Sequence, residues 1–289
     1  MRGRSLLALA AVLALAWLVV PAKAQSPDEV LSFARHLVWV GQPEAAGIEF
    51  RRFLFLFPDD SRAPAARLDL AEACLESGRP GEARRVLFEL PPQPDEALAG
   101  RAVLLLGRLE KESGRRAEAE AILARLAGDE AFSLAIRDEA RYRLGWLYLE
   151  QGAWVEAGQA FSAMDPAGQR GIEAALLARD APGGAALERK SPLGSGIMSG
   201  LLPGLGQVYL KRFSDAAWSA GLSFGPGVLS YLAFVGGSFV TGGVLAGLAV
   251  AFWAGNVYNA VNQAHQTNRR VEDQFRRQLS LALQGLGRP

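Results

Sequence analysis

The side chains that most often carry chemistry are few in this chain, and they do not form a catalytic or metal-binding set. His36 and His265 are the two histidines and Cys74 is the single cysteine, so no Cys/His cluster has metal-ligand spacing and no disulfide can form within the chain. Ser195 and Ser199 lie in a glycine-rich apolar stretch with no plausible base nearby. The sequence therefore predicts no enzyme, no cofactor and no metal site, and it indicates no small-molecule substrate.

Two further patterns have simpler interpretations than chemistry. The carboxylates Glu118 and Glu120 stand beside Arg115 and Arg116, which is typical of a solvated helix face with exposed ion pairs. The stretch "GLGQVY" lacks the preceding strand and the following carboxylate of a dinucleotide-binding fingerprint, and the chain has no Walker loop.

A glycine that recurs at a nearly constant spacing is the strongest pattern in the chain. Gly41, Gly78, Gly114 and Gly152 are separated by 37, 36 and 38 residues. Each glycine is followed five residues later by an alanine, at positions Ala46, Ala83, Ala119 and Ala157. We expect each glycine to end one helix in the left-handed conformation and each alanine to let the next helix approach closely. Self-similarity at this period predicts a stack of helical hairpins, and three of the units end in prolines: Pro58, Pro91–Pro92 and Pro166.

This pattern resembles the tetratricopeptide repeat over roughly residues 27–166, and "YRLGWLYLEQGAWVEAGQAFSAMDP" matches best. The middle units depart from it, with Cys74 and Glu110 at one aromatic position and Leu87 and Leu123 at the other. The resemblance implies an all-α helical-hairpin solenoid of about four pairs over residues 25–178, with a groove for a protein or peptide partner. The candidate groove residues on the first helices are His36, Arg67, Arg141 and Trp146.

The first 24 residues have the features of a secretory signal peptide. Arg2 and Arg4 precede an apolar run, and Pro21 is followed by a small-x-small site that predicts cleavage after Ala24. An uncleaved N-terminal anchor is the alternative. Export would place the repeats in the periplasm of a bacterium.

Charge divides the rest of the chain into two parts. Residues 25–188 hold 27 acidic and 19 basic residues, whereas residues 189–289 hold 3 acidic and 9 basic residues. The acidic, mixed-sign repeat region argues against nucleic acid as a ligand, because that partner would require a basic stripe.

The second part is predicted to be a membrane domain over residues 192–268, after a polar linker at 179–191. Residues 213–235 and 238–258 are long and apolar enough to cross a bilayer as a helical transmembrane hairpin. Residues 192–209 are apolar but rich in glycine and proline, which fits either a short kinked span or a re-entrant segment. Basic residues after each crossing favour three crossings, whereas the glycine content of 192–209 favours two, so the side of the C-terminus stays open.

The motif "PGLGQVY" resembles a sequence shared by small bacterial membrane domains related to the two-transmembrane domain family, over roughly Lys190–Asn268. Its residues are Pro203, Gly204, Gly206, Gln207 and Tyr209. The resemblance implies a compact helical membrane module and brings no catalytic residue.

Asn256 and Asn259 lie near the predicted membrane boundary, ahead of a polar tail at 269–289 that keeps a helical pattern. They either hydrogen-bond Gln207 or the glycine-turn backbone, or they belong to a solvated helix leaving the bilayer. The leading functional hypothesis is a non-enzymatic scaffold, anchored to the bacterial inner membrane with its repeats in the periplasm. The alternative is a subunit of an envelope assembly or transport complex in which the membrane module is the working part.

Overall fold

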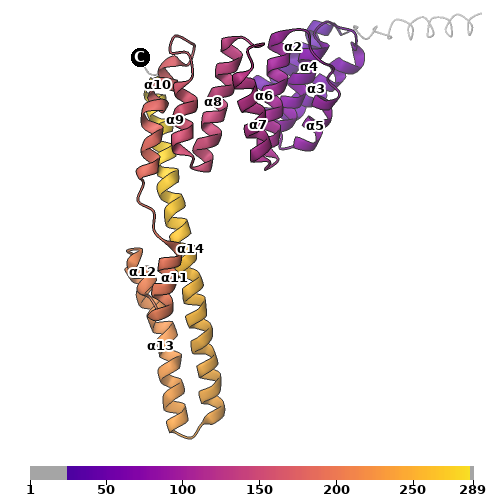
Figure 1. Cartoon of the computed structure of the whole chain (residues 1–289). Helices are drawn as coiled ribbons and strands as arrows, with labels where there is room; N and C mark the ends of the chain where they lie inside the picture. The colour runs from indigo at the N-terminus through magenta and orange to yellow at the C-terminus, as the bar shows by residue number, and fades with distance from the viewer. Residues whose placement is uncertain (1–24, 287–289) are drawn as a thin grey trace, which may run out of the picture. The chain divides into compact units, whose positions relative to one another are not determined.

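The computed structural model describes residues 25–286, and within them all regular structure is helical. The chain divides into two compact units, residues 1–144 and 145–289, which are described in turn (Figure 1). The predicted signal peptide at residues 1–24 lies outside the described residues.

The first unit consists of consecutive antiparallel helical hairpins. Its helices are α2 (Pro27–Trp39), α3 (Pro43–Leu56), α4 (Ala63–Glu76), α5 (Pro80–Phe88), α6 (Glu96–Glu112) and α7 (Arg116–Gly128), followed by the first part of α8 (Leu134–Gln151). The hairpins are α2 with α3, α4 with α5, and α6 with α7, and α4 packs against both α3 and α6. The helical-hairpin repeat predicted from the glycine spacing is confirmed.

The repeated glycines close the hairpins as expected. Gly41, Gly78, Gly114 and Gly152 all have positive φ, at 74°, 68°, 80° and 75°. At Gly78 the backbone N–H bonds the Leu75 carbonyl at 2.9 Å, and the Arg79 N–H reaches back to the Cys74 carbonyl at 2.8 Å. This pairing satisfies carbonyls that a helix end otherwise leaves free.

The four alanines that follow these glycines are completely buried. Ala46 and Ala83 belong to the core of the first unit, in which Phe50, Phe53, Leu68 and Leu109 are fully enclosed. Close helix approach also needs Gly107, because a Cβ there would come within 3.0 Å of the Leu123 side chain. The small residues therefore fix how tightly each hairpin closes.

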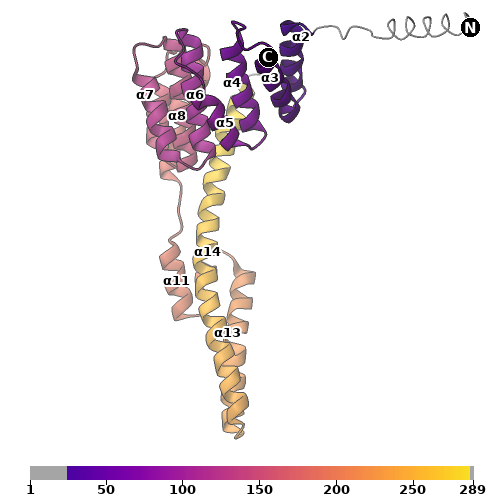
Figure 2. The same ribbon diagram turned by 90° about the vertical axis from the view of Figure 1, so that its right-hand side faces the viewer.

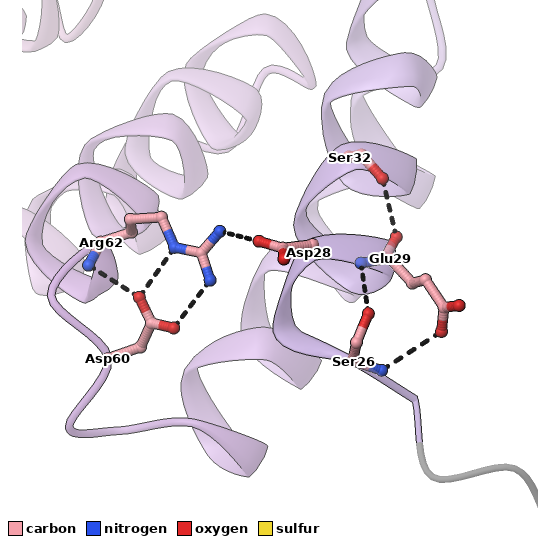
Figure 3. Close-up of polar contacts among 6 residues, drawn as sticks. All are labelled: Ser26, Asp28, Glu29, Ser32, Asp60 and Arg62. Carbon is pink, nitrogen blue, oxygen red and sulfur yellow. Dashed lines mark hydrogen bonds and ion pairs between the residues drawn. The ribbon is translucent and has the colours of Figure 1, made fainter.

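The first helix is held at its N-terminus by a capping box. The Glu29 N–H donates to the Ser26 hydroxyl at 3.1 Å, and the Ser26 N–H donates to the Glu29 carboxylate at 3.2 Å (Figure 3). In the same view Arg62 bridges Asp60 and Asp28, which ties the α3–α4 loop to α2. Hydrogen bonds from Arg62 lower the pKa of Asp60 from 3.8 to about 2.

The second unit begins inside α8 and holds the remaining elements. These are α9 (Trp154–Ser162), α10 (Gly171–Asp180), the 3-10 helix η1 (Ala181–Ala186), α11 (Pro192–Leu201), α12 (Leu205–Tyr209), α13 (Phe213–Val235) and α14 (Phe239–Leu286). One of them falls where the sequence predicts a linker. Residues 181–186, inside the expected linker, form η1, where Gly184 lies so close to Trp154 that a Cβ would come within 2.3 Å of its ring.

The last helix continues without a break from the apolar hairpin through the polar tail, for 48 residues. Its far end packs against α10 and η1 (Figure 1), and its first part lies beside α13 and α11 (Figure 2). The Phe275 and Trp154 rings meet edge to face with centroids 5.3 Å apart. Arg276 lies over the same indole, and its guanidinium donates to the Leu149 carbonyl at 3.0 Å. The C-terminal segment thus belongs to the packing of the last repeat.

Candidate functional sites in the repeats and in the apolar hairpin

The glycine-rich motif forms the turn between the two short helices α11 and α12. Gly204 has φ of 95°, and a Cβ there would come within 2.5 Å of the Ala216 carbonyl oxygen. Gly206 is equally confined, because a Cβ would lie 2.2 Å from the Ser195 carbonyl oxygen. Both positions need glycine for steric reasons, and Pro203 precedes them in the turn after α11.

A cluster of buried polar side chains fills the space between α11, α12 and α14. We call Ser195, Ser199, Gln207 and Asn256 the buried polar cluster; the first three are fully enclosed and Asn256 is 6% exposed. Gln207 donates to the Asn256 side-chain oxygen at 2.9 Å and accepts from the Ser199 hydroxyl at 3.1 Å. Each side chain of the cluster therefore has a partner.

Backbone groups complete this cluster. The Asn256 amide donates to the Ser199 carbonyl at 3.3 Å, and the Ser195 hydroxyl lies 3.1 Å from the Ala260 carbonyl. The Gly206 N–H donates to the Ser199 hydroxyl at 3.1 Å. The cluster holds the two short helices against α14.

The other predicted motif residues make different contacts. The Tyr209 hydroxyl accepts from the Ser191 N–H at 3.1 Å, at the start of α11. Asn259 is exposed, so of the two asparagines only Asn256 makes the expected bond to Gln207. Sequence reasoning missed Asn268, whose side chain accepts from the Lys190 N–H at 2.7 Å and donates to the Lys190 carbonyl at 2.8 Å. The four-residue spacing of Ser195 and Ser199 on one helix face was the available signal for a polar seam.

The outward surface of the same helices is apolar. Leu193, Leu201, Phe213, Trp218 and Val235 each expose two thirds or more of their side-chain area. Of the most apolar 18-residue window in each of α13 and α14, only 11% is buried. Polar groups inside and apolar groups outside invert the arrangement of a water-soluble bundle. Both α13 and α14 are long and apolar enough to cross a membrane.

Residues 192–209 form two short helices and not one long helix. Helix α11 has ten residues, or about 15 Å at 1.5 Å per residue, against a hydrocarbon core of about 30 Å. A turn separates α11 from the five-residue α12. The two alternatives for this segment, a short kinked span and a re-entrant segment, both stay predictions.

The repeats carry a groove that is mostly apolar, between α5 and α6. It has a volume of about 420 Å³. Its lining is Leu87, Phe88, Leu90, Pro91, Pro92, Gln93, Ala99, Ala102, Val103 and Leu106. Phe88 forms a wall and is 75% exposed. The groove can take an apolar side chain of a partner, and we call it the α5–α6 groove.

The predicted groove residues lie elsewhere. Arg67 lines a second, more polar groove of about 500 Å³ beside Arg51 and Arg85, and His36 is exposed with its ring 5.8 Å from that of Trp39. Arg141 pairs with Asp138 at 2.7 Å. In the second unit, the half-buried Trp146 packs edge-on against Phe161 with centroids 6.4 Å apart. Sequence reasoning missed the α5–α6 groove, because its lining comes from the end of one repeat and the start of the next.

Ion pairs join the first helices of the three repeats of the first unit. Asp69 on α4 pairs with Arg35 on α2 at 3.3 Å and with Arg101 on α6 at 2.7 Å. Arg101 also pairs with Glu72 at 2.7 Å. These ion pairs hold neighbouring repeats together, and they pair the charged side chains of these three helices with one another.

The buried residues with reactive side chains in the repeats have structural roles. Glu110, at an aromatic position of the repeat, is 7% exposed and pairs with Arg84 at 3.0 Å and with Arg115. Burial raises the pKa of the Cys74 thiol, which disfavours the reactive thiolate. Among residues 25–286 no group of His, Cys, Asp and Glu side chains could hold a metal ion.

Comparison with known proteins adds a weak structural likeness. No protein family and no curated protein matches the sequence. Among solved structures, the chain is similar to a tetratricopeptide repeat protein from Parabacteroides merdae ATCC 43184, at 16% sequence identity and a TM-score of 0.40. The match covers 89% of this chain and 100% of that one. The assignment of helical-hairpin repeats rests on the geometry described above.

Proposed function

We propose that this protein is a non-enzymatic scaffold, anchored in the bacterial inner membrane by α13 and α14, that binds a protein or peptide partner through its repeats. The observation that carries the proposal is the inverted packing of the second unit. The buried polar cluster is enclosed, while Leu193, Phe213 and Trp218 point outward. In water this arrangement would expose a large apolar surface, whereas in lipid that surface is solvated and the buried polar cluster supplies its own hydrogen bonds.

Two crossings would place both ends of the hairpin on one side of the membrane. The end of α14 packs on the fourth repeat through Phe275 and Trp154, so the repeats and the C-terminus share that side. Residues 1–24 read as an export signal, which makes this side the periplasm. The basic residues near the hairpin favour the opposite orientation. The export signal, however, is synthesised before the hairpin, and long domains are translocated largely regardless of the charge of their residues.

The partner surface that best fits the proposal is the α5–α6 groove. Helical-hairpin repeats commonly bind an extended peptide or a helix of another protein. An apolar groove with an exposed aromatic wall would supply the buried anchor that dominates such contacts. No nucleic acid, cofactor or small-molecule substrate enters the proposal.

Membrane anchoring is tested by fractionation of cells that express the full chain. The protein should stay in the membrane pellet after extraction at high pH, and a protease added to spheroplasts should digest the repeats. Release into the soluble fraction would refute the anchor. Protection of the repeats in spheroplasts, with digestion after lysis, would refute the periplasmic orientation.

Partner binding is tested by photocrosslinking in intact cells. A crosslinking amino acid at Ala102 in the α5–α6 groove should yield a discrete adduct with another protein, and a second Phe88→Asp substitution should abolish it. A crosslinker at the exposed Arg116 on α7 is the control, because it does not line the groove. Equal adducts from both positions, or an adduct indifferent to Phe88, would exclude this groove as the binding surface.

The alternative, that the membrane module itself is the working part of a transport or assembly complex, is separable in the full-length protein. A Phe88→Asp variant should abolish function if the repeats bind the partner. It should leave function intact if the membrane module acts alone.

A further inference from the structure

A band of cationic side chains surrounds the second unit where its outward apolar surface ends. Lys190 precedes α11, Lys211 and Arg212 lie between α12 and α13, and Arg269 and Arg270 lie on α14. These positions are far apart in sequence, but the fold brings them to the same height along α14.

Hydrogen bonds and a cation–ring contact hold the basic residues at this height along α14. Asn268 binds both the N–H and the carbonyl of Lys190, at 2.7 and 2.8 Å. The Lys190 ammonium lies 5.3 Å from the centre of the Tyr209 ring, two residues before Lys211. Arg269 follows Asn268 directly on α14. The loops before α11 and after α12 therefore meet α14 at the same height.

The carboxylates of this region already have cationic partners. Glu188 pairs with Lys190 at 2.5 Å, Asp215 with Arg212 at 2.5 Å, and Glu272 with Arg189 at 3.3 Å. Asp273, the remaining carboxylate between residue 189 and the end of α14, pairs with Arg276 at 2.6 Å.

Three exposed cations are left over. Among the described residues, Lys211, Arg269 and Arg270 form no ion pair within 4.0 Å, and the one carboxylate that Lys211 influences, Glu188, is already paired with Lys190. Lys211 has φ of 60°, a left-handed conformation that a lysine rarely adopts. The band thus carries a net positive charge that the protein does not neutralise.

The position of the cationic band relative to the apolar surface indicates which groups neutralise its positive charge. Exposed apolar side chains lie directly below it at the start of two helices, with Leu193 on α11 and Phe213 on α13, whereas on α14 the exposed Tyr258 lies about 16 Å below Arg269 along the helix. If these side chains lie in hydrocarbon, as the proposed function requires, the three cations lie at the level of the lipid phosphates. We propose that Lys211, Arg269 and Arg270 bind the headgroups of anionic phospholipids.

This chemistry favours lipid over a soluble anionic partner. A headgroup is held at the depth of the band by its own acyl chains, so each contact forms without ordering a free ligand. Each cation near an anionic surface contributes about a fivefold gain in affinity, so removing three should weaken binding on the order of a hundredfold.

The test uses the full-length protein in detergent, with thermal unfolding followed as phosphatidylglycerol is added. Phosphatidylcholine is the zwitterionic control, and glycerol 3-phosphate supplies the same phosphate without acyl chains. The variant K211Q/R269Q/R270Q removes the three cations. The matched control R85Q/R116Q/R125Q removes three exposed arginines from the repeats.

We expect phosphatidylglycerol to raise the unfolding temperature of the wild type and of the matched control, and phosphatidylcholine to have less effect. The triple variant should need on the order of a hundredfold more phosphatidylglycerol for the same shift. The single variant K211G suits the left-handed turn while removing one charge, so it separates loss of lipid binding from misfolding. It should need about fivefold more lipid.

Equal shifts from the two lipids, or an unchanged response in the triple variant, would overturn the lipid-binding inference. An equal shift with glycerol 3-phosphate would show a soluble-phosphate site instead and would also overturn it. The inference rests on the proposed membrane anchor, which is checked separately by extraction of wild-type membranes at high pH. Retention of the protein there, without a lipid preference, would refute only the headgroup contact.

Discussion

The Gln207 side-chain amide donates a hydrogen bond of 2.9 Å to the side-chain oxygen of Asn256, and both residues are buried. The bond joins the short helix α12 to α14 in a part of the molecule whose outer surface is apolar. Buried amides without a partner are costly in hydrocarbon, because no water is present to replace the lost bond. The pair therefore holds α12 against α14.

This bond can be measured by a double-mutant cycle with Gln207→Leu, Asn256→Leu and the double variant. Each single change leaves a buried polar group unpaired, so we expect each to lower the free energy of unfolding by about 1–3 kcal/mol. The double variant should lose less than the sum, with a coupling of about 0.5–2 kcal/mol. Unfolding of the purified full-length protein in detergent measures all three.

The control is Asn259→Leu, which changes an exposed asparagine on the same helix. Its effect should stay within about 0.5 kcal/mol, as for surface substitutions away from special features. Additive losses in the cycle would show that Gln207 and Asn256 act independently, contrary to the geometry.

Local rules made the repeat predictable from sequence. The left-handed glycines and the buried alanines each solve a backbone or packing problem within one hairpin, so their spacing reveals them. The bond between Gln207 and Asn256 was within reach for the same reason, since a polar residue in an apolar segment needs a partner.

Contacts between distant segments could not be read in this way. Glu110 stands where the repeat usually has an aromatic residue, and only the structure shows Arg84, 26 residues away, neutralising it. Likewise, nothing local to Phe275 indicates Trp154 as its neighbour, or that the expected linker folds into η1 against that indole. The α5–α6 groove was missed because it forms only when two repeats stack.

The second repeat offers a matched pair of glycines for a test of the turn. Gly78 has φ of 68° and Gly81 lies inside α5, and an added Cβ would meet no atom within 4 Å at either position. Gly78→Ala should therefore destabilise by about 1–2 kcal/mol through backbone strain alone. Gly81→Ala should stabilise by about 0.4–1 kcal/mol, because alanine suits a helix better than glycine. Thermal unfolding of both variants measures the difference, and equal effects would contradict the left-handed turn.

The Asp60–Arg62 contact predicts a pH dependence of stability. Asp60 has its pKa lowered to about 2 in the folded protein, against 3.8 for the free side chain, first through its side-chain hydrogen bond with Arg62. The contact thus stabilises the fold above about pH 4, and this contribution is lost as the pH falls from about 4 toward 2. Asp60→Asn should lower the unfolding temperature at pH 6 by an amount that shrinks steadily below pH 4.

The effect of Asp60→Asn should also diminish at high salt, because the contact is near the surface. The control is Asp59→Asn, which changes the neighbouring exposed carboxylate. A difference between wild type and Asp60→Asn that stays constant down to pH 2 would show that the carboxylate charge does not carry the stabilisation.

The packing of α14 on the fourth repeat predicts that the two unfold together. Phe275 supplies the ring that meets Trp154, and Arg276 adds a bond to the Leu149 carbonyl. Phe275→Ala should destabilise this contact by about 1–3 kcal/mol, less than for a fully enclosed aromatic because the side chain is partly exposed. Hydrogen exchange should then accelerate in α9 and η1 as well as at the end of α14. The control is Gln278→Ala, which changes an exposed residue on the same helix and should leave the exchange rates of all three segments unchanged. Faster exchange confined to α14 would show that the repeat is stable without its C-terminal helix.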